Sequence, residues 1–243
     1  MPWYKDWFGE EYIELYSHRD ESEAEEHVDF VERGLGGGGP KPRAVLDLAC
    51  GSGRHTAALR RRGYRTLGVD LSLTLLARMR ERGLPPVAGD MRGLPFVDGS
   101  FDWVLNFFTS FGYFEREREN FRVLEEIVRI LVPGGRFLID LLNPGPVLAG
   151  LKARDVEEME GGRAVIERWY DPVVQRVNKS ISIETPGARA RTFRESVRLY
   201  RPDEVTIGLR WAGLEVDGLY GNFQGDSYER DSERLILLGH KPA

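Results

Sequence analysis

The sequence is poor in cysteine and in long apolar runs: Cys50 is its single cysteine in 243 residues. One thiol excludes an internal disulfide and a cysteine-cluster metal site, and it favours a cytoplasmic location. No apolar run approaches the ~18 residues that a membrane-spanning helix needs. The amino-terminal stretch MPWYKDWFGEEYIELY lacks the basic start and apolar core of a secretory signal. We therefore expect a cytoplasmic protein with no membrane partner.

The sequence also lacks an excess of positive charge. Its formal net charge is −5, and only five of its 34 basic residues are lysines. A phosphate backbone normally requires a basic face, so a nucleic-acid partner is not expected. A hydrophobic content of 41% and a charged content of 30% are ordinary for a soluble globular protein.

Glycine and proline divide the chain into two parts. The stretch GLGGGGPKP at 34–42 separates an aromatic, acidic amino-terminal segment, residues 1–42, from the remainder, residues 43–243. Short apolar runs alternate with helical patterns from residue 44 to residue 142, as in βαβ units. This alternation predicts a doubly wound, mostly parallel sheet that is wrapped by helices.

The rhythm changes after Asn143. RAVIERWY, VVQRVNKSISIE and RTFRESVRLY alternate polar and apolar residues with period two, which predicts antiparallel strands with one wet face. We place this antiparallel insertion at about 160–200. A helix and two further strands then complete the main domain.

A glycine loop follows the first predicted strand. Gly51 and Gly53 allow close approach of a ligand, and the following helix offers free N–H groups. Asp47 lies inside that strand; because a buried acid is costly without donors, we expect backbone N–H groups to satisfy it. A dinucleotide-binding loop would need a third glycine where Thr56 stands. The loop alone therefore does not identify the ligand.

Two further aspartates stand at predicted strand ends. Asp70, 19 residues after Gly51, can accept hydrogen bonds from both hydroxyls of a ribose. Asp90 can accept from an adenine amino group, although it could also simply cap a turn. Both positions predict a bound nucleoside at the carboxyl ends of the strands.

The successive motifs VLDLACGSGRHT, TLGVDLS, VAGDMRGLPF, FDWVLNFFTSFGYF and LVPGGRFLIDL resemble those of class I S-adenosylmethionine-dependent methyltransferases. The amino-terminal segment and the insertion are more loosely similar to glycine N-methyltransferases and deoxyamino-sugar N,N-dimethyltransferases. The resemblance implies a Rossmann-like seven-stranded sheet with an antiparallel β insertion and an N-terminal helical lid. It also implies S-adenosyl-L-methionine as cofactor and S-adenosyl-L-homocysteine as product.

By this resemblance, the backbone of Ala49, Gly51 and Gly53 holds the methionine portion of the cofactor. Ala49 departs from the family pattern, which usually has a glycine there. Asp47 either belongs to the cofactor site or only ties down the loop.

The nucleoside end is also implied by the resemblance. Asp70 binds the ribose, with Leu71 against the adenine, and Asp90 faces the adenine amino group, with Met91 against its ring. The carbonyl of Phe107 lies near the methionine amine.

The amino-terminal segment either packs as an ordinary helix or folds over the cofactor, in which case Tyr16 and Arg19 hold the methionine carboxylate. The aromatic group NFFTSFGYF at 106–114 divides between core and pocket. No catalytic residue is assigned. The candidates for a general base are Tyr16, His18, His55, Tyr113 and Glu195.

The resulting hypothesis is methyl transfer to a small molecule by a monomer or homodimer, with no metal site. Three alternatives stay open: an RNA or protein methyltransferase, an S-adenosylmethionine-binding protein without turnover, and a nicotinamide-dependent oxidoreductase. The acidic charge balance disfavours the first, and the missing third glycine disfavours the last.

Overall fold

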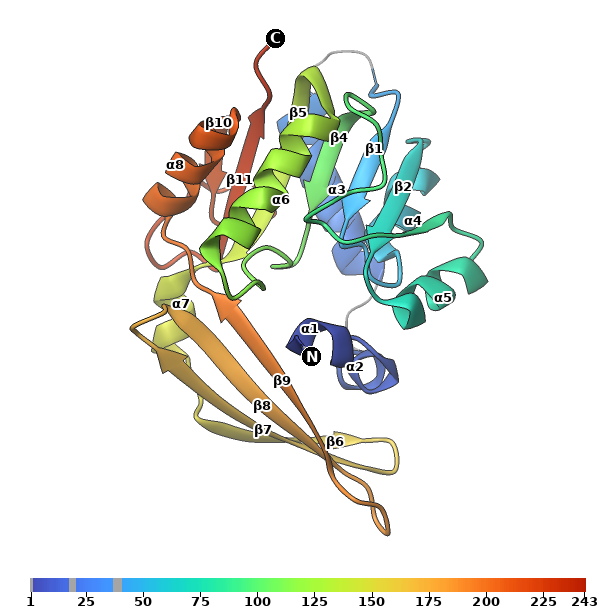
Figure 1. Cartoon of the computed structure of the whole chain (residues 1–243), viewed down its shortest axis with the longest axis vertical. Helices are drawn as coiled ribbons and strands as arrows, with labels where there is room; N and C mark the ends of the chain where they lie inside the picture. The colour runs from blue at the N-terminus through green and yellow to red at the C-terminus, as the bar shows by residue number, and fades with distance from the viewer. Residues whose placement is uncertain (1, 18–20, 37–40) are drawn as a thin grey trace.

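The computed structural model describes residues 2–17, 21–36 and 41–243. It contains a seven-stranded sheet with helices on both faces and a separate four-stranded sheet (Figure 1). The elements of the main domain are α3 (Glu21–Gly36), β1 (Val45–Leu48), α4 (Arg54–Arg61), β2 (Thr66–Asp70), α5 (Leu73–Glu81), β3 (Pro86–Ala88), β4 (Phe101–Asn106), α6 (Glu117–Ile130), β5 (Leu131–Leu142), α8 (Pro202–Ala212), β10 (Glu215–Tyr220) and β11 (Arg234–His240).

The strand order of the large sheet is β10-β11-β5-β4-β1-β2-β3. The strands from β3 to β5 are parallel, whereas β11 runs antiparallel to both β5 and β10. The order reverses between β1 and β4, so their carboxyl ends open the crevice in which such folds bind ligands. The predicted doubly wound, mostly parallel sheet is confirmed.

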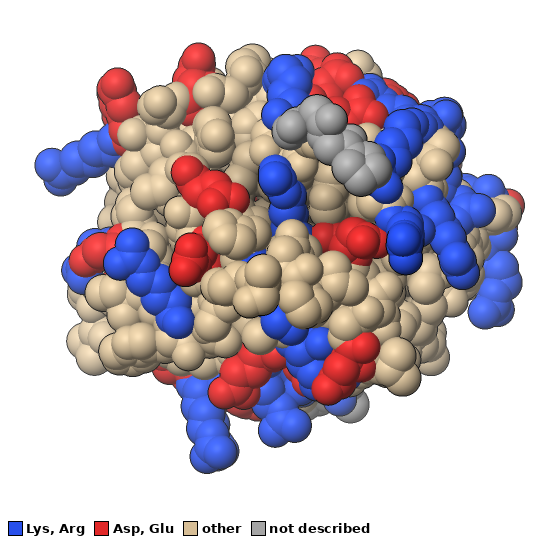
Figure 2. All heavy atoms as spheres, turned by 90° about the horizontal axis from the view of Figure 1, so that it is seen from above, with Lys and Arg blue, Asp and Glu red and all other residues tan. Residues whose placement is uncertain are grey.

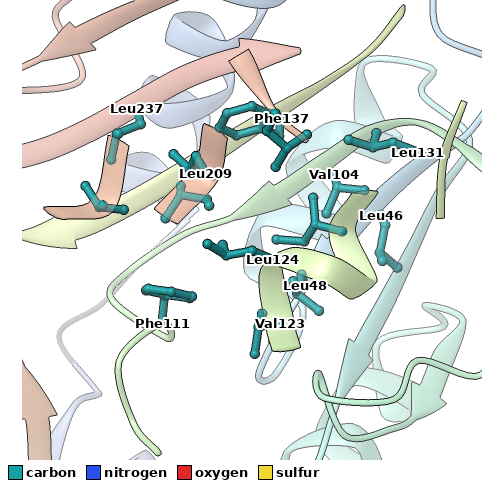
Figure 3. Close-up of a cluster of buried hydrophobic side chains, with 14 of the residues drawn as sticks. Leu46, Leu48, Val104, Phe111, Val123, Leu124, Leu131, Phe137, Leu209 and Leu237 are labelled. Atoms are coloured by element: carbon teal, nitrogen blue, oxygen red, sulfur yellow. The ribbon is translucent and has the colours of Figure 1, made fainter. Parts of the chain in front are cut away.

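Helices cover both faces of this sheet because successive strand residues point to opposite sides. Val45 and Leu105 pack against α3 and α4, whereas Leu46 and Val104 face the cluster that contains α6 residues. Figure 3 shows this second cluster, in which Leu124 of α6 lies over the strands. Each fully buried aliphatic side chain contributes about 1.5–3 kcal/mol.

The second sheet is antiparallel, with the order β6-β7-β8-β9. The predicted insertion is present, but its first strand begins at Arg154, before the expected start near residue 160. This edge strand was not predicted because the stretch RDVEEM is mostly charged and lacks an apolar period of two. The elements are α7 (Pro144–Ala149), β6 (Arg154–Met159), β7 (Gly162–Asp171), β8 (Arg176–Glu184) and β9 (Arg191–Arg198).

Two short helices, α1 (Trp3–Asp6) and α2 (Glu10–Leu15), lie between the two sheets (Figure 1). Trp7, which follows α1, is fully buried against the inner face of the four-stranded sheet. On the opposite side, the Ser72 hydroxyl donates a 2.6 Å hydrogen bond to the Phe8 carbonyl. The predicted N-terminal helical segment therefore bridges the insertion and the main domain.

The surface seen in Figure 2 carries basic and acidic side chains that are interspersed. None of the helices in the described residues is both long and apolar enough to cross a membrane.

Candidate active site

A cavity of about 380 Å³ opens at the carboxyl ends of β1, β2 and β4, beneath α1 and α2. It is lined by the amino-terminal helices, the end of β1 with the following loop, the start of α4, the end of β2, the first turn of α5, the residues after β3 and the aromatic segment after β4. The lining residues are Tyr4, Phe8, Tyr12, Ile13, Tyr16, Ser17, Asp47, Leu48, Ala49, Cys50, Gly51, Ser52, Arg54, His55, Val69, Asp70, Leu71, Ser72, Leu75, Gly89, Asp90, Met91, Phe107, Phe108, Ser110, Tyr113 and Phe114.

The loop after β1 adopts left-handed backbone conformations in three places. Ala49 has φ +59°, Gly51 has φ +56° and Gly53 has φ +81°. Ala49 is therefore a strained residue in the cavity wall, since its Cβ disfavours this region by roughly 1–2 kcal/mol. Gly53 is not among the lining residues. A Cβ there would stand 2.8 Å from Met79 Cγ, so this glycine allows α4 to pack against α5.

Asp47 is buried beneath this loop and anchors the start of α4. Its carboxylate accepts a 2.7 Å hydrogen bond from the Thr56 hydroxyl and a second one from the Thr56 backbone N–H. Burial raises the pKa of Asp47 to about 6, against the effect of these bonds. The expected backbone donor is therefore present, and a side-chain donor supplements it.

Asp70 ends β2 and reaches the cavity. One carboxylate oxygen accepts from the Gly51 N–H at 2.9 Å and the other from the Ser72 N–H at 2.8 Å. Burial raises the pKa of Asp70 above its ordinary value, and these backbone donors oppose the shift. Because a carboxylate has about four lone-pair sites, both oxygens can still accept from a ligand.

Asp90 also lines the cavity, one strand further along the sheet. Its carboxylate accepts from the backbone N–H of Arg92 at 3.0 Å and from the Arg92 side chain at 2.6 Å. Burial acts to raise the pKa of Asp90, but the hydrogen bonds from Arg92 outweigh it and hold the pKa below its ordinary value. Asp90 thus stabilises a turn and contributes a fixed negative charge to the cavity.

A strained turn follows β4. Phe108 and Thr109 have φ +61° and +59°, so two consecutive residues with side chains occupy the left-handed region. Asp140 holds this turn by accepting from the Phe108 N–H at 2.7 Å, and Arg234 bonds both Asp140 and the Thr109 hydroxyl at 2.7 Å. Strain of this kind, about 1–3 kcal/mol per residue, concentrates at functional sites.

The aromatic segment after β4 divides between cavity and core. Phe107, Phe108, Tyr113 and Phe114 line the cavity, whereas Phe111 packs against Tyr200 in the core. The amino-terminal helices add further aromatic rings, which continue from Tyr113 as a row of ring contacts in the order Phe8, Tyr12 and Tyr16. The centroids of neighbouring rings in this row lie 4.9–5.8 Å apart.

Sequence reasoning missed Arg54, which is the one lysine or arginine among the described lining residues. Its guanidinium pairs with Glu23 of α3 and lies 5.1 Å from the centre of the Phe108 ring. The helix period assigned Arg54 to the start of α4, but nothing in the sequence indicated that it faces the cavity.

His55, a candidate base, is paired with a second histidine. His27 Nδ1 lies 2.9 Å from His55 Nε2, and the His55 ring stacks on Phe107 at 4.0 Å. Burial lowers the pKa of His27 to about 4 and that of His55 well below its ordinary value. Both imidazoles are therefore neutral at neutral pH, so this wall of the cavity adds no positive charge.

The other expectations divide in three ways. Tyr16 and Tyr113 line the cavity together with Leu71 and Met91, whereas Glu195 lies behind Tyr16 and does not line it. Arg19 and His18 lie outside the described residues. No group of three or more metal-binding side chains occurs within the described parts of the chain.

Comparison with known proteins identifies the family. Residues 45–135 match the model of the methyltransferase domain family. The cypemycin N-terminal methyltransferase of a Streptomyces species is 33% identical over 204 residues, which cover 81% of this chain and 82% of that protein.

Solved structures agree with this assignment. The methyltransferase CcbJ from Streptomyces caelestis superposes with a TM-score of 0.81 at 21% identity over 98% of each chain, a likeness of fold. The sugar N-methyltransferase KedS8 from Streptoalloteichus superposes with a TM-score of 0.73 at 26% identity, covering 97% of this chain and 94% of that one. The chain therefore belongs to the class I S-adenosylmethionine-dependent methyltransferases.

Proposed function

We propose that this enzyme transfers a methyl group from S-adenosyl-L-methionine to the nitrogen of a small-molecule amine bound beneath α1 and α2. One observation carries the proposal: a single cavity joins two strand-end carboxylates, Asp70 and Asp90, to a wall of aromatic rings. The bound cofactor supplies a methyl group on a sulfonium leaving group. The chain must then bind both partners, align them and exclude water.

The chemistry of the lining fits the cofactor. Asp70 offers acceptors for the ribose hydroxyls and Asp90 offers one for the adenine amino group, with Leu71 and Met91 as apolar contacts for the ring. Phe107 contributes its backbone carbonyl to the methionine end.

At the methionine end, Ala49 and Gly51 present backbone, whereas Asp47 and Gly53 support the loop from behind. Arg54 is a cation suited to the methionine carboxylate, together with Arg19. The Tyr16 hydroxyl donates its proton to Glu195, so it offers the methionine end an acceptor, which suits the ammonium group. Ring faces also attract a sulfonium, by ~0.5–2 kcal/mol.

The acceptor class follows from charge and from the relatives. Carboxylates and ring faces line the cavity, and both favour a ligand that becomes cationic on methylation. The names of two relatives, the cypemycin N-terminal methyltransferase and the sugar N-methyltransferase KedS8, also favour a nitrogen acceptor. At about 380 Å³ the cavity is at the small end of ligand pockets, roughly 300–1,000 Å³, which disfavours a macromolecular acceptor such as RNA.

We further propose that residues 1–42 act as lid and linker and that residues 43–243, with their insertion, form the methyltransferase domain. The single cysteine supports a cytoplasmic location. The enzyme would act as a monomer or a homodimer.

Turnover tests this function. The full chain is incubated with S-adenosylmethionine labelled in its methyl group and with a panel of amino sugars and short peptides that have free amino termini. We expect label to enter at least one amine in step with the formation of S-adenosylhomocysteine. Labelling of RNA or of carbon acceptors only would contradict the proposed acceptor, and cofactor binding without any transfer would favour a non-catalytic binding protein.

A further inference from the structure

The inner face of the four-stranded sheet holds the amino-terminal helices by apolar contacts. Ile166, Ile181 and Phe193 of the sheet are buried together with Trp7 and Leu15 of the amino-terminal segment. Charged residues are not expected on such a face, since each buried ion loses several kcal/mol of hydration.

Ion pairs nevertheless lie on this inner face, such as the one between Arg168 of β7 and Asp155 of β6, and one of them faces the amino-terminal helices. Lys179 of β8 and Glu195 of β9 are cross-strand neighbours, and the Lys179 Nζ stands 2.8 Å from Glu195 Oε2. The exposed fractions of these side chains are 27% and 13%. Burial would lower the pKa of Lys179, but Glu195 and Tyr16 outweigh it and hold this pKa above the ordinary range.

The pair contacts the amino-terminal segment at two points. Glu195 Oε1 accepts a 2.6 Å hydrogen bond from the Trp7 indole N–H and a 3.3 Å bond from the Tyr16 hydroxyl. The Lys179 ammonium donates to the same Tyr16 oxygen at 3.1 Å. Tyr16 in turn lines the cavity, so the pair lies directly behind one wall of the active site.

Fold stability does not explain the presence of the pair. Replacing a buried ion pair with well-packed uncharged residues of similar volume is often neutral or stabilising, provided that no polar partner is left unpaired. A charge-free pair that still offers an acceptor to Trp7 would therefore preserve the fold. What it would remove is the ammonium contact of Lys179 with the Tyr16 hydroxyl, so that this hydroxyl loses one of its hydrogen-bond partners.

We propose that Lys179 and Glu195 are positioning residues of the methyltransferase site, which fix the Tyr16 hydroxyl in the cavity wall against the methionine end of the cofactor. The antiparallel insertion would thereby contribute to cofactor binding without contacting the cofactor itself. This inference rests on the proposed function of the cavity.

The test is a double-mutant cycle on the full chain, read by calorimetry with two probes. The variants are Lys179→Met/Glu195→Gln, Tyr16→Phe and the three changes combined. S-adenosylhomocysteine carries the amino-acid portion of the cofactor, whereas methylthioadenosine has the same nucleoside without it. The control is Arg163→Met/Glu184→Gln, which neutralises a cross-strand ion pair with exposed fractions of 56% and 41%.

We expect the paired change and Tyr16→Phe each to weaken S-adenosylhomocysteine binding at least ~5-fold, with Tm unchanged. The combined variant should lose no more than Tyr16→Phe alone, because coupled residues are non-additive. Methylthioadenosine affinity should stay within about twofold in every variant, and the control should match the wild type with both probes.

Additive losses, equal losses for both probes or unchanged S-adenosylhomocysteine binding would each overturn the positioning role while leaving the proposed function intact. Failure of the wild type to bind either probe would instead overturn the proposed function, and this inference with it.

Discussion

At the scale of single residues, buried groups in the cavity wall and directly behind it have pKa values that are shifted in opposite directions. His27 and His55 have depressed pKa values, about 4 for His27, because burial disfavours their charged forms. Asp47 has a pKa raised to about 6 for the same reason. Each group therefore couples folding to pH, with a sign that depends on which form is charged.

The histidines bind fewer protons in the folded state than in the unfolded state. Their contribution to stability is full above pH 6.5 and is lost as the pH falls towards 4. Asp47 contributes in the reverse sense: its stabilising effect is present below pH 3.8 and is lost as the pH rises through 6. Asp70, whose pKa burial also raises, acts in the same sense as Asp47. The pKa values of the two histidines are shifted further, so the histidine contribution should dominate.

We predict that the free energy of unfolding rises between about pH 4 and pH 6.5, and that Asp47→Asn makes the rise steeper, by at most ~1.4 kcal/mol per pH unit. Urea unfolding at intervals across this range measures both slopes. Asparagine keeps an acceptor for Thr56, so folding should survive the change. A variant curve parallel to the wild-type curve would contradict the assignment of Asp47.

Part of this chemistry was predictable from the sequence. The positions of Asp70 and Asp90 at adjacent strand ends follow from the βαβ rhythm, because parallel neighbours end at one edge of the sheet. The pairing of His27 with His55 did not follow, because it depends on how α3 packs against α4. The strained Phe108–Thr109 turn was equally hidden, since its cause is Asp140 in β5.

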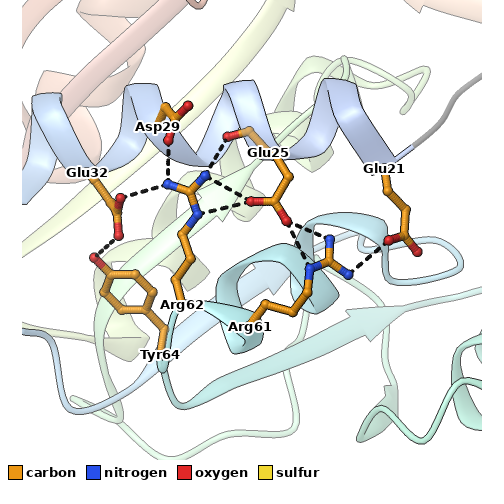
Figure 4. Close-up of polar contacts among 7 residues, drawn as sticks. All are labelled: Glu21, Glu25, Asp29, Glu32, Arg61, Arg62 and Tyr64. Carbon is orange, nitrogen blue, oxygen red and sulfur yellow. Dashed lines mark hydrogen bonds and ion pairs between the residues drawn. The ribbon is translucent and has the colours of Figure 1, made fainter.

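At the scale of elements, α3 is attached to α4 by a network of charges. Figure 4 shows Arg62 reaching Glu25, Asp29 and Glu32 of α3, whereas Arg61 reaches Glu21 and Glu25. The side chain of Arg62 is 23% exposed and that of Arg61 is 45% exposed. Shielding from solvent and the number of partners both favour Arg62 as the stronger connection.

We predict that Arg62→Met lowers the free energy of unfolding by about 1–2 kcal/mol, whereas Arg61→Met lowers it by less than about 0.5 kcal/mol. Thermal unfolding at low and high salt compares the two variants. The difference between them should shrink at high salt, because screening weakens exposed pairs. Equal losses for both variants would show that the network does not depend on Arg62.

The sequence predicted most elements of the main domain, because βαβ alternation and helical period are local signals. It missed β6 because the sequence RDVEEM is mostly charged and does not alternate between polar and apolar residues, although exposed and partly buried side chains alternate along the strand. The position of α1 and α2 was implied only by the family resemblance and not by local patterns, since their contacts with β9 join residues about 190 positions apart, as Trp7 and Glu195 show.

At the scale of the whole molecule, the large sheet and the amino-terminal helices enclose the cavity, and the small sheet packs against these helices from the other side. The large sheet supplies the carboxylates and the glycine loop, whereas the small sheet holds α1 and α2 over them (Figure 1). The class I methyltransferase sheet thus supplies the side of the cavity with the carboxylates and the glycine loop, and the amino-terminal helices, held by the insertion, supply the opposite side.

The central claim is that Asp70 binds the cofactor in this cavity, and the chain offers a matched control. Asp102 also accepts from two backbone N–H groups, those of Arg43 at 2.9 Å and Ala44 at 2.8 Å, yet it is not a lining residue. Asp70→Ala and Asp102→Ala therefore each remove a carboxylate that holds backbone N–H groups, although Asp70 also accepts from Leu71, and only the first removes an acceptor from the cavity.

The most direct measurement is calorimetric titration of S-adenosylmethionine into the wild type and these two variants. We predict that Asp70→Ala weakens binding more than ~10-fold, because the ribose hydroxyls lose a charged acceptor, while Asp102→Ala binds like the wild type. Equal affinity for Asp70→Ala and the wild type, or equal losses in both variants, would contradict the account.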